Sequence, residues 1–168
     1  CYNFAFNKDN RRHVFRNTEA PFDGYRVITD PRDPMIPAIH AVAHKGIYSP
    51  NRTVADFLDV CNTWHCSLIA VTHEGRLKGY AVMDGGGSIS EVRSVEREDF
   101  IPLLRTILVR SEHAAIHVSL PPFEYEAIRA LVPVCEGVNE GCSMMYTVLN
   151  YEKVIRAFLS LKASYTTL

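Results

Sequence analysis

The chain has 168 residues, of which 47% are hydrophobic and 22% charged, and its formal net charge at pH 7 is −1. This size and composition are typical of one soluble globular domain. A net charge so close to zero gives no electrostatic basis for binding nucleic acid or an anionic membrane surface. No apolar run approaches the roughly 20 residues that a membrane-spanning helix needs.

The cysteines indicate the compartment and argue against a metal site. There are five of them, an odd number: Cys1, Cys61, Cys66, Cys135 and Cys142. Their spacings, Cys-x4-Cys and Cys-x6-Cys, match no common zinc pattern. We therefore expect reduced, mostly buried thiols, no bound metal and a cytoplasmic location.

The first third of the chain predicts one strand, a polar linker, a second strand and two helices. Residues 1–6 are strand-like, residues 7–22 are polar and predict a linker, and a short strand follows over 25–30. The first helix spans about 33–46, and Asn51 or Thr53 caps the second. The apolar stripe of the first helix is Ile36, Ile39, His40, Val42 and Ala43, and that of the second is Val54, Phe57, Leu58, Cys61 and Trp64.

The middle of the chain predicts an antiparallel meander. Its strands cover residues 67–72, 77–83 and 89–95. Glu74-Gly75 forms a tight hairpin between the first two, and residues 84–87 form the second turn. The first of these strands is apolar nearly throughout, as is typical of a strand buried on both faces.

The last part of the chain alternates helices and strands. A helix begins at Glu98 or Asp99 and places Pro102 in its first turn, where a missing N–H is harmless. A strand at 114–119, a helix at 123–132, a strand at 143–149 and a helix at 151–161 follow. The complete order predicts an α/β fold with a mixed, mostly antiparallel sheet flanked by helices.

This order resembles that of the GNAT-type N-acetyltransferase superfamily. The segment 68–82, which includes Gly75-Arg-Leu-Lys-Gly-Tyr-Ala-Val82, is similar to the second and third strands of that family. The segment 91–104, with Glu91-Val-Arg-Ser-Val95 and Phe100-Ile-Pro-Leu-Leu104, is similar to its fourth strand and third helix. The resemblance implies an acetyltransferase-like arrangement of sheet and helices.

The segment 145–156, Met-Tyr-Thr-Val-Leu-Asn-Tyr-Glu-Lys-Val-Ile-Arg, resembles a domain seam in enhanced-intracellular-survival (Eis) type tandem acetyltransferases. There a second acetyltransferase-like domain passes into a sterol-carrier-like domain. The resemblance implies three parts in this chain. Residues 1–22 are the closing strand of a preceding domain plus a linker, 23–149 are the acetyltransferase-like domain, and 150–168 begin a following sterol-carrier-like domain.

One departure from the family pattern bears on the cofactor. Active relatives resemble one another in carrying Arg/Gln-x-x-Gly-x-Gly/Ala after the fourth strand, where backbone N–H groups grip the pyrophosphate of coenzyme A. This chain has Glu96-Arg-Glu-Asp-Phe-Ile-Pro-Leu there, with no glycine. Glu96, Glu98 and Asp99 are expected to repel a diphosphate, and Pro102 removes a donor. We therefore expect no acetyl-CoA site, and no catalytic or metal residue, in this segment.

Several side chains fit a site pattern but have simpler structural interpretations. Glu91 lies where many family members keep a general base, yet it can equally pair with Arg93 or a neighbouring strand. Tyr125 and Tyr146 are candidate general acids, although tyrosines at such positions are more often core or interface residues. His40 and His44 share one helix face at zinc-binding spacing, but no third ligand is evident.

Three further motifs are assigned no site. Gly85-Gly86-Gly87 lies between two strands and lacks the residues of a phosphate-binding loop. Cys66 and His65 are expected to be adjacent in a strand and to point to opposite faces, which argues against a nucleophile and base pair. The basic residues Arg11, Arg12, His13 and Arg16 predict a solvated connector.

The leading hypothesis is that this segment is the non-catalytic second domain of an acetyl-CoA-dependent N-acetyltransferase that acts on a primary amine. The resemblance implies that acetyl-CoA binds outside this segment, and that the segment supports the substrate cleft, its neighbouring domains and a homo-oligomer. The edges at residues 1–6 and 164–168 would then be exposed and need covering. A self-sufficient divergent acetyltransferase and a pure interaction module remain open alternatives.

Overall fold

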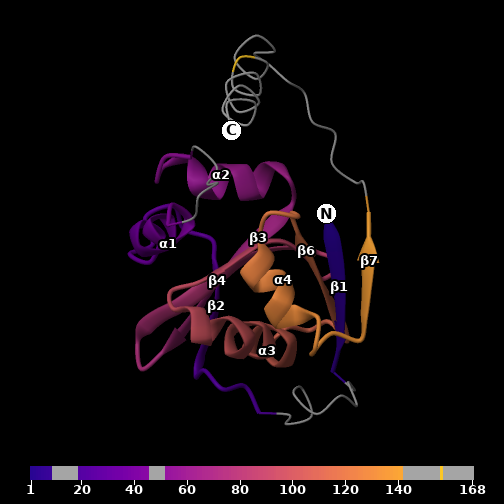
Figure 1. Cartoon of the computed structure of the whole chain (residues 1–168). Coiled ribbons are helices and arrows are strands. Elements are labelled where there is room, and N and C mark those ends of the chain that lie inside the picture. Colours follow the sequence, from indigo (N-terminus) through magenta and orange to yellow (C-terminus); the bar gives the residue numbers. More distant parts are fainter. Residues whose placement is uncertain (9–18, 46–51, 142–155, 157–168) are drawn as a thin grey trace, which may run out of the picture.

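The computed structural model describes residues 1–8, 19–45 and 52–141, together with Arg156. Seven strands form one sheet in the order β2-β3-β4-β5-β6-β1-β7 (Figure 1). The strands are β1 (Tyr2–Asn7), β2 (Gly24–Ile28), β3 (Cys66–His73), β4 (Arg76–Asp84), β5 (Ser88–Ser94), β6 (Ala115–Leu120) and β7 (Gly137–Glu140). The helices are α1 (Ile36–Ala43), α2 (Asp56–Thr63), α3 (Phe100–Arg110) and α4 (Tyr125–Leu131), and a 3-10 turn, η1 (Arg97–Asp99), precedes α3.

All neighbouring strands pair antiparallel except β5 and β6, which pair parallel. The predicted fold class, a mixed and mostly antiparallel sheet flanked by helices, is therefore confirmed. The strand expected at 143–149 and most of the helix expected at 151–161 lie outside the described residues, although Arg156 is helical.

Two apolar clusters cover the two faces of the sheet. Leu68 and Ala70 of β3 contribute to the cluster beneath α1 and α2, whereas Ile69 and Val71 contribute to the one beneath α3. All four side chains are buried. The nearly continuous apolar run in this strand therefore has the predicted cause, because successive side chains enter opposite cores.

The β3–β4 hairpin follows from two residues with positive φ. Glu74 has φ 50° and Gly75 has φ 74°, and the strands end and begin directly beside them at His73 and Arg76. Positive φ at both central positions defines the type I′ turn, whose twist matches that of paired strands. The predicted tight hairpin is confirmed.

A bulge in β5 changes which side chains face each core. Val82 pairs with Glu91, but Met83 pairs with Ile89, so Ser90 is the extra residue. As a result Ile89 and Val92 lie in the same cluster although they are three positions apart. Strict alternation would have placed them on opposite faces.

The strand at the start of the chain lies inside the sheet. β1 pairs with β6 on one side and with β7 on the other, and the side chains of Phe4 and Phe6 are fully buried. The expectation of an exposed edge here is therefore wrong, because both edges of β1 have hydrogen-bonding partners. The corresponding expectation for residues 164–168 lies outside the described residues, and the proposed division into domains remains a prediction.

β7 was not predicted from the sequence. All four of its residues are exposed, so it lacks the alternation of apolar and polar residues that marks a half-buried strand. In the described part of the chain its strand pairing is with β1 alone. The strand therefore depends on β1, a partner more than 130 positions away.

The apolar face predicted for α2 is too long. Phe57, Leu58 and Cys61 are buried as expected, but Trp64 is 75% exposed and Val54 is also exposed. The helix spans only Asp56–Thr63, so Val54 precedes it and Trp64 lies in the following turn. The predicted cap is confirmed, since the Asp56 N–H donates to Thr53 Oγ1 at 3.2 Å.

None of the described helices has the length and hydrophobicity of a membrane span.

The described cysteines form no disulfide bonds. Cys61 is buried in α2, and this desolvation raises the pKa of its thiol from 9.0 to about 11. Cys142 lies outside the described residues.

Raising the pH from 9 to 11 should destabilise the fold through Cys61. In this range the thiol ionises in the unfolded chain but stays protonated in the folded protein, so the folded state binds more protons and stability falls as pH rises. The loss attributable to Cys61 should reach about 2 kcal/mol. Urea unfolding at pH 8 and pH 11 measures it, and Cys61→Ala should show a smaller pH-dependent loss than the wild type. An equal loss in the two proteins would contradict this assignment.

Candidate functional site

A cavity in the described structure begins where β5 and β6 separate. These parallel strands pair only at Ser88↔His117 and Ile89↔Val118, directly before the bulge at Ser90. Beyond the bulge a cavity of about 970 Å³ lies between β5, η1 and the start of α3 on one side and the end of β6 and α4 on the other. We call this cavity the β5–β6 cleft.

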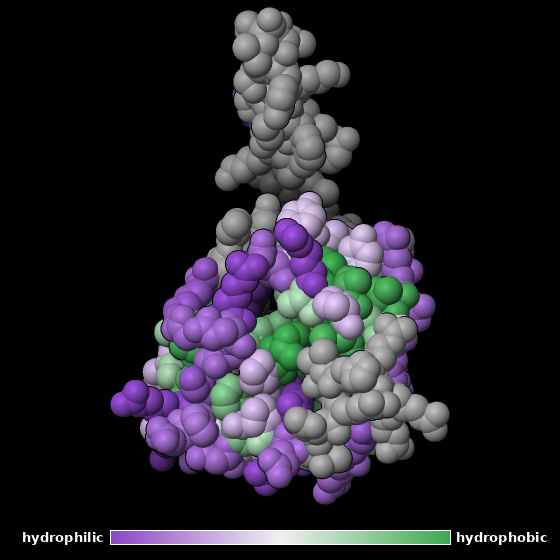
Figure 2. Space-filling view, turned by 60° about the horizontal axis from the view of Figure 1, so that its bottom comes forward, coloured by the Kyte–Doolittle hydropathy of each residue, from purple (hydrophilic) through white to green (hydrophobic). Residues whose placement is uncertain are grey.

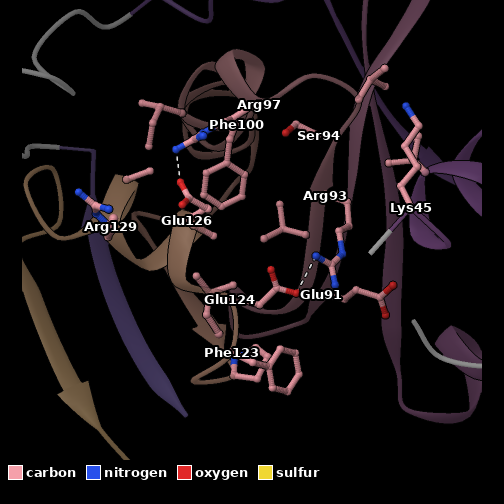
Figure 3. Close-up of a pocket in the computed structure, with 18 of the residues that line it drawn as sticks. Lys45, Glu91, Arg93, Ser94, Arg97, Phe100, Phe123, Glu124, Glu126 and Arg129 are labelled. Atoms are coloured by element: carbon pink, nitrogen blue, oxygen red, sulfur yellow. Dashed lines mark hydrogen bonds and ion pairs between the residues drawn. The ribbon is translucent and has the colours of Figure 1, made fainter. Parts of the chain in front are cut away.

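Two ion pairs cross the cleft. Arg93 Nη1 of β5 lies 2.7 Å from Glu124 Oε1, and the two side chains are 26% and 22% exposed. Arg97 of η1 pairs in the same way with Glu126 of α4, in a more exposed position. Figure 3 shows both pairs, with each arginine on the β5 side and each glutamate on the α4 side. The pairs therefore join the two walls of the cleft.

Glu91, the candidate general base, has both carboxylate oxygens engaged. The hydroxyl of Tyr80 donates to Oε1 at 2.5 Å, and Arg52 Nη1 lies 2.9 Å from Oε2. Tyr80 is fully buried, and its burial together with the negative charge of Glu91 raises the pKa of its hydroxyl. Of the expected pairings, Arg93 is not the partner, because it pairs with Glu124 instead. The geometry describes a structural ion pair in the wall of the cleft.

The turn after β5 uses its own backbone donors. The N–H of Asp99 donates to the carbonyl of Glu96 at 3.2 Å, and that of Phe100 donates to the carbonyl of Arg97. Because these N–H groups already donate to carbonyl oxygens within the turn, they are not available to donate to an anion at the start of α3.

Of the three acidic residues at this turn that were expected to face a diphosphate, one lines the cleft. Glu98 lines it, whereas Glu96 does not. Asp99 is buried, and its Oδ2 accepts from Lys78 Nζ at 3.1 Å, away from the cleft. The expectation for Asp99 is wrong, because Lys78 of β4 provides a counter-ion that the local sequence does not show. Glu91, Glu124 and Glu126 line the cleft together with Glu98, and Glu124 and Glu126 were not predicted from the sequence to lie at a site.

The rings of His40 in α1 and His44 directly after it lie close together, but their nitrogens contact backbone carbonyls. The rings of His40 and His44 are 4.1 Å apart. His40 Nε2 lies 2.7 Å from the carbonyl oxygen of Arg52, and His44 Nδ1 lies 2.9 Å from that of His40. Within the residues that the structure describes, no group of three or more metal-ligating side chains occurs.

The remaining candidates are dispersed. Tyr125 is 70% exposed and does not line the cleft. Cys66 Sγ contacts the carbonyl oxygen of Trp64 at 3.4 Å. Tyr146 and the basic residues Arg11, Arg12, His13 and Arg16 lie outside the described residues.

The three-glycine segment is a turn, as predicted. Asp84 Oδ1 accepts from the N–H groups of Gly86 and Ser88, each at 2.8 Å. Gly87 has φ 84°, and a Cβ there would lie 2.9 Å from the carbonyl oxygen of Ala115. The turn therefore needs glycine at this position for both its backbone angle and its close approach to β6.

No family model matches the chain, and no curated protein matches it. A solved structure that resembles it is a GCN5-related N-acetyltransferase from Kribbella flavida, with 14% sequence identity and a TM-score of 0.48. The match covers 82% of this chain and 35% of that one, so the chain spans about a third of the length of that protein.

Proposed function

We propose that this chain is a non-catalytic, acetyltransferase-like module of a larger acetyl-CoA-dependent N-acetyltransferase that acts on a primary amine. The observation that carries the proposal is the pair of ion pairs across the β5–β6 cleft, Arg93–Glu124 and Arg97–Glu126. Both ion pairs would have to break before a diphosphate could bind between these two walls.

The charges around the cleft support this interpretation. Four cationic side chains line it, matched by four carboxylates. The cations are Lys45, Arg93, Arg97 and Arg129, and the carboxylates are Glu91, Glu98, Glu124 and Glu126. A lining with balanced charge does not concentrate an anionic cofactor as an excess of positive charge does. The engaged N–H groups of Asp99 and Phe100 remove two donors that could otherwise attract an anion.

In this proposal the chain supports a catalytic domain that binds acetyl-CoA outside it. The module forms one wall of a substrate cleft, contacts the preceding and following domains and contributes to a homo-oligomer in the cytoplasm. Exposed apolar side chains offer contacts for such neighbours. They are Val27, Val54, Trp64, Phe123, Tyr125, Val132 and Val138. Figure 2 shows one face on which apolar residues gather between hydrophilic ones.

Acetyl-CoA at millimolar concentration should leave the melting temperature of the chain unchanged, because only a ligand that binds the native state stabilises it. Differential scanning fluorimetry with acetyl-CoA, and with an equal ionic strength of NaCl as the control, measures this. A rise of several degrees that NaCl does not reproduce would contradict the proposal.

A self-sufficient acetyltransferase is the second candidate, and one observation favours it. Two parallel strands that separate beside a cavity of about 970 Å³ leave room for an elongated ligand. The same experiment separates the candidates, since this one requires stabilisation by acetyl-CoA.

A further inference from the structure

Arg93 belongs to a set of four charged side chains at the cleft, three of which line it. Arg52 pairs with Glu91 at 2.9 Å, and Arg93 pairs with Glu124 at 2.7 Å. The exposed fractions of these four side chains lie between 16% and 26%. The set is neutral, with two cations and two carboxylates, and it is partly shielded from water. Charges in such a setting interact more strongly than they do at an open surface.

Glu124 differs from the other three members of this set because it comes from the opposite wall. Glu91 and Arg93 lie on β5, whereas Glu124 directly precedes α4. Figure 3 shows its carboxylate reaching across the cleft to the guanidinium of Arg93. Without Glu124 the set would contain two cations and one carboxylate. The excess positive charge would then face a cavity large enough for a small ligand.

Glu124 lies before the residues that attach α4 to the core. Leu131 is buried in the cluster beneath α3, and Ala127, Ile128 and Ala130 are partly buried against the same cluster, whereas the Glu124 side chain makes no capping hydrogen bond to the helix. The neighbouring side chains of Phe123 and Tyr125 are exposed. A rotation of the Glu124 side chain away from Arg93 would break the ion pair and leave the apolar contacts of α4 in place.

We propose that Arg93 is an anion-binding residue whose site is filled in this structure by the carboxylate of Glu124. A compact oxyanion that enters the cleft, a phosphate or a carboxylate, takes the place of Glu124 and separates the α4 wall from β5. The guanidinium fork binds both kinds of oxyanion with the same planar geometry that it offers to glutamate. Glu124 thus acts as an internal competitor for the site.

The test uses the full 168-residue chain, titrated calorimetrically at low ionic strength with inorganic pyrophosphate and, separately, with citrate. Glu124→Gln preserves the size of the side chain and removes its charge. It should bind at least one of the two anions about tenfold more tightly than the wild type does, as expected when a charged competitor for a charge-assisted contact is removed. The double variant Arg93→Gln/Glu124→Gln should lose this gain.

Glu140→Gln is the matched control, because it makes the same chemical change on exposed β7, outside the cleft. A folded Glu124→Gln protein that binds neither anion more tightly than Glu140→Gln does would overturn the proposal. The proposal would also be overturned if the double variant Arg93→Gln/Glu124→Gln bound the anion as tightly as Glu124→Gln does. Glu124→Ala provides a second variant in case Glu124→Gln does not fold.

This inference does not depend on the proposed function, because its test compares variants with one another. Acetyl-CoA binding by the wild type would count against the proposed function alone.

Discussion

Replacing Phe4 by alanine should lower the free energy of unfolding by about 3–5 kcal/mol, the range typical of a fully buried phenylalanine. Its side chain is 0% exposed and lies in the cluster beneath α3, and its strand forms the link between β6 and β7. The substitution leaves a cavity next to Val118, its partner in β6. Equilibrium unfolding in urea, followed by circular dichroism, measures the change.

Val138→Ala is the control for this prediction, since Val138 faces Phe4 across the β1–β7 pair but is exposed. It should cost less than about 1 kcal/mol. If Phe4→Ala proved equally mild, β1 would not contribute to the stability of this sheet. The result would then favour assigning residues 1–6 to a different folding unit.

The parts of the fold that could be predicted are those with a local physical signal. The β3–β4 hairpin was visible because Glu74-Gly75 separates two apolar segments and suits a turn with positive φ. The helix α3 was predictable because its apolar residues recur at helical spacing. They are buried in the structure, apart from the half-buried Ile101, Pro102 and Val109.

The parts that could not be predicted depend on distant partners. The position of β1 between β6 and β7 involves residues far apart in the chain, and its alternation alone does not reveal which sheet it joins. The exposed β7 has no periodic signal of its own. The bulge at Ser90 reverses the facing of Ile89, an effect that becomes visible only when β4 and β5 are paired.

The candidate site shows the same limit. The resemblance indicated the turn after β5 as the place where active relatives bind coenzyme A, and Glu98 of this turn lines the cleft. The residues that span the cleft, Glu124 and Glu126, lie about 30 positions away from their arginine partners. Nothing in the local sequence distinguishes them from ordinary surface glutamates at the start of a helix. A pairing between elements so distant needs the three-dimensional arrangement.

Replacing Glu91 by glutamine should lower the free energy of unfolding by about 2–3 kcal/mol, because it breaks a largely buried ion pair. The substitution keeps the volume and one oxygen acceptor for Tyr80, but it leaves the Arg52 guanidinium without its carboxylate at a position that is only 20% exposed. Removing one partner of a fully buried ion pair costs about 3–5 kcal/mol, and the partial exposure here reduces that cost. Thermal and urea unfolding of the variant measure it.

Glu126→Gln provides the matched comparison, because it makes the same change in the exposed Arg97–Glu126 pair and should cost no more than about 1 kcal/mol. The double variant Arg52→Gln/Glu91→Gln should recover part of the loss, since it removes the unpaired cation that Glu91→Gln leaves behind. The double-mutant cycle of these two substitutions should give a coupling energy of at least about 1 kcal/mol. A Glu91→Gln protein as stable as the wild type, with no coupling to Arg52, would show that the carboxylate is not needed for the fold. Glu91 would then again be a candidate general base, and the proposal of a non-catalytic module would lose its structural explanation for this residue.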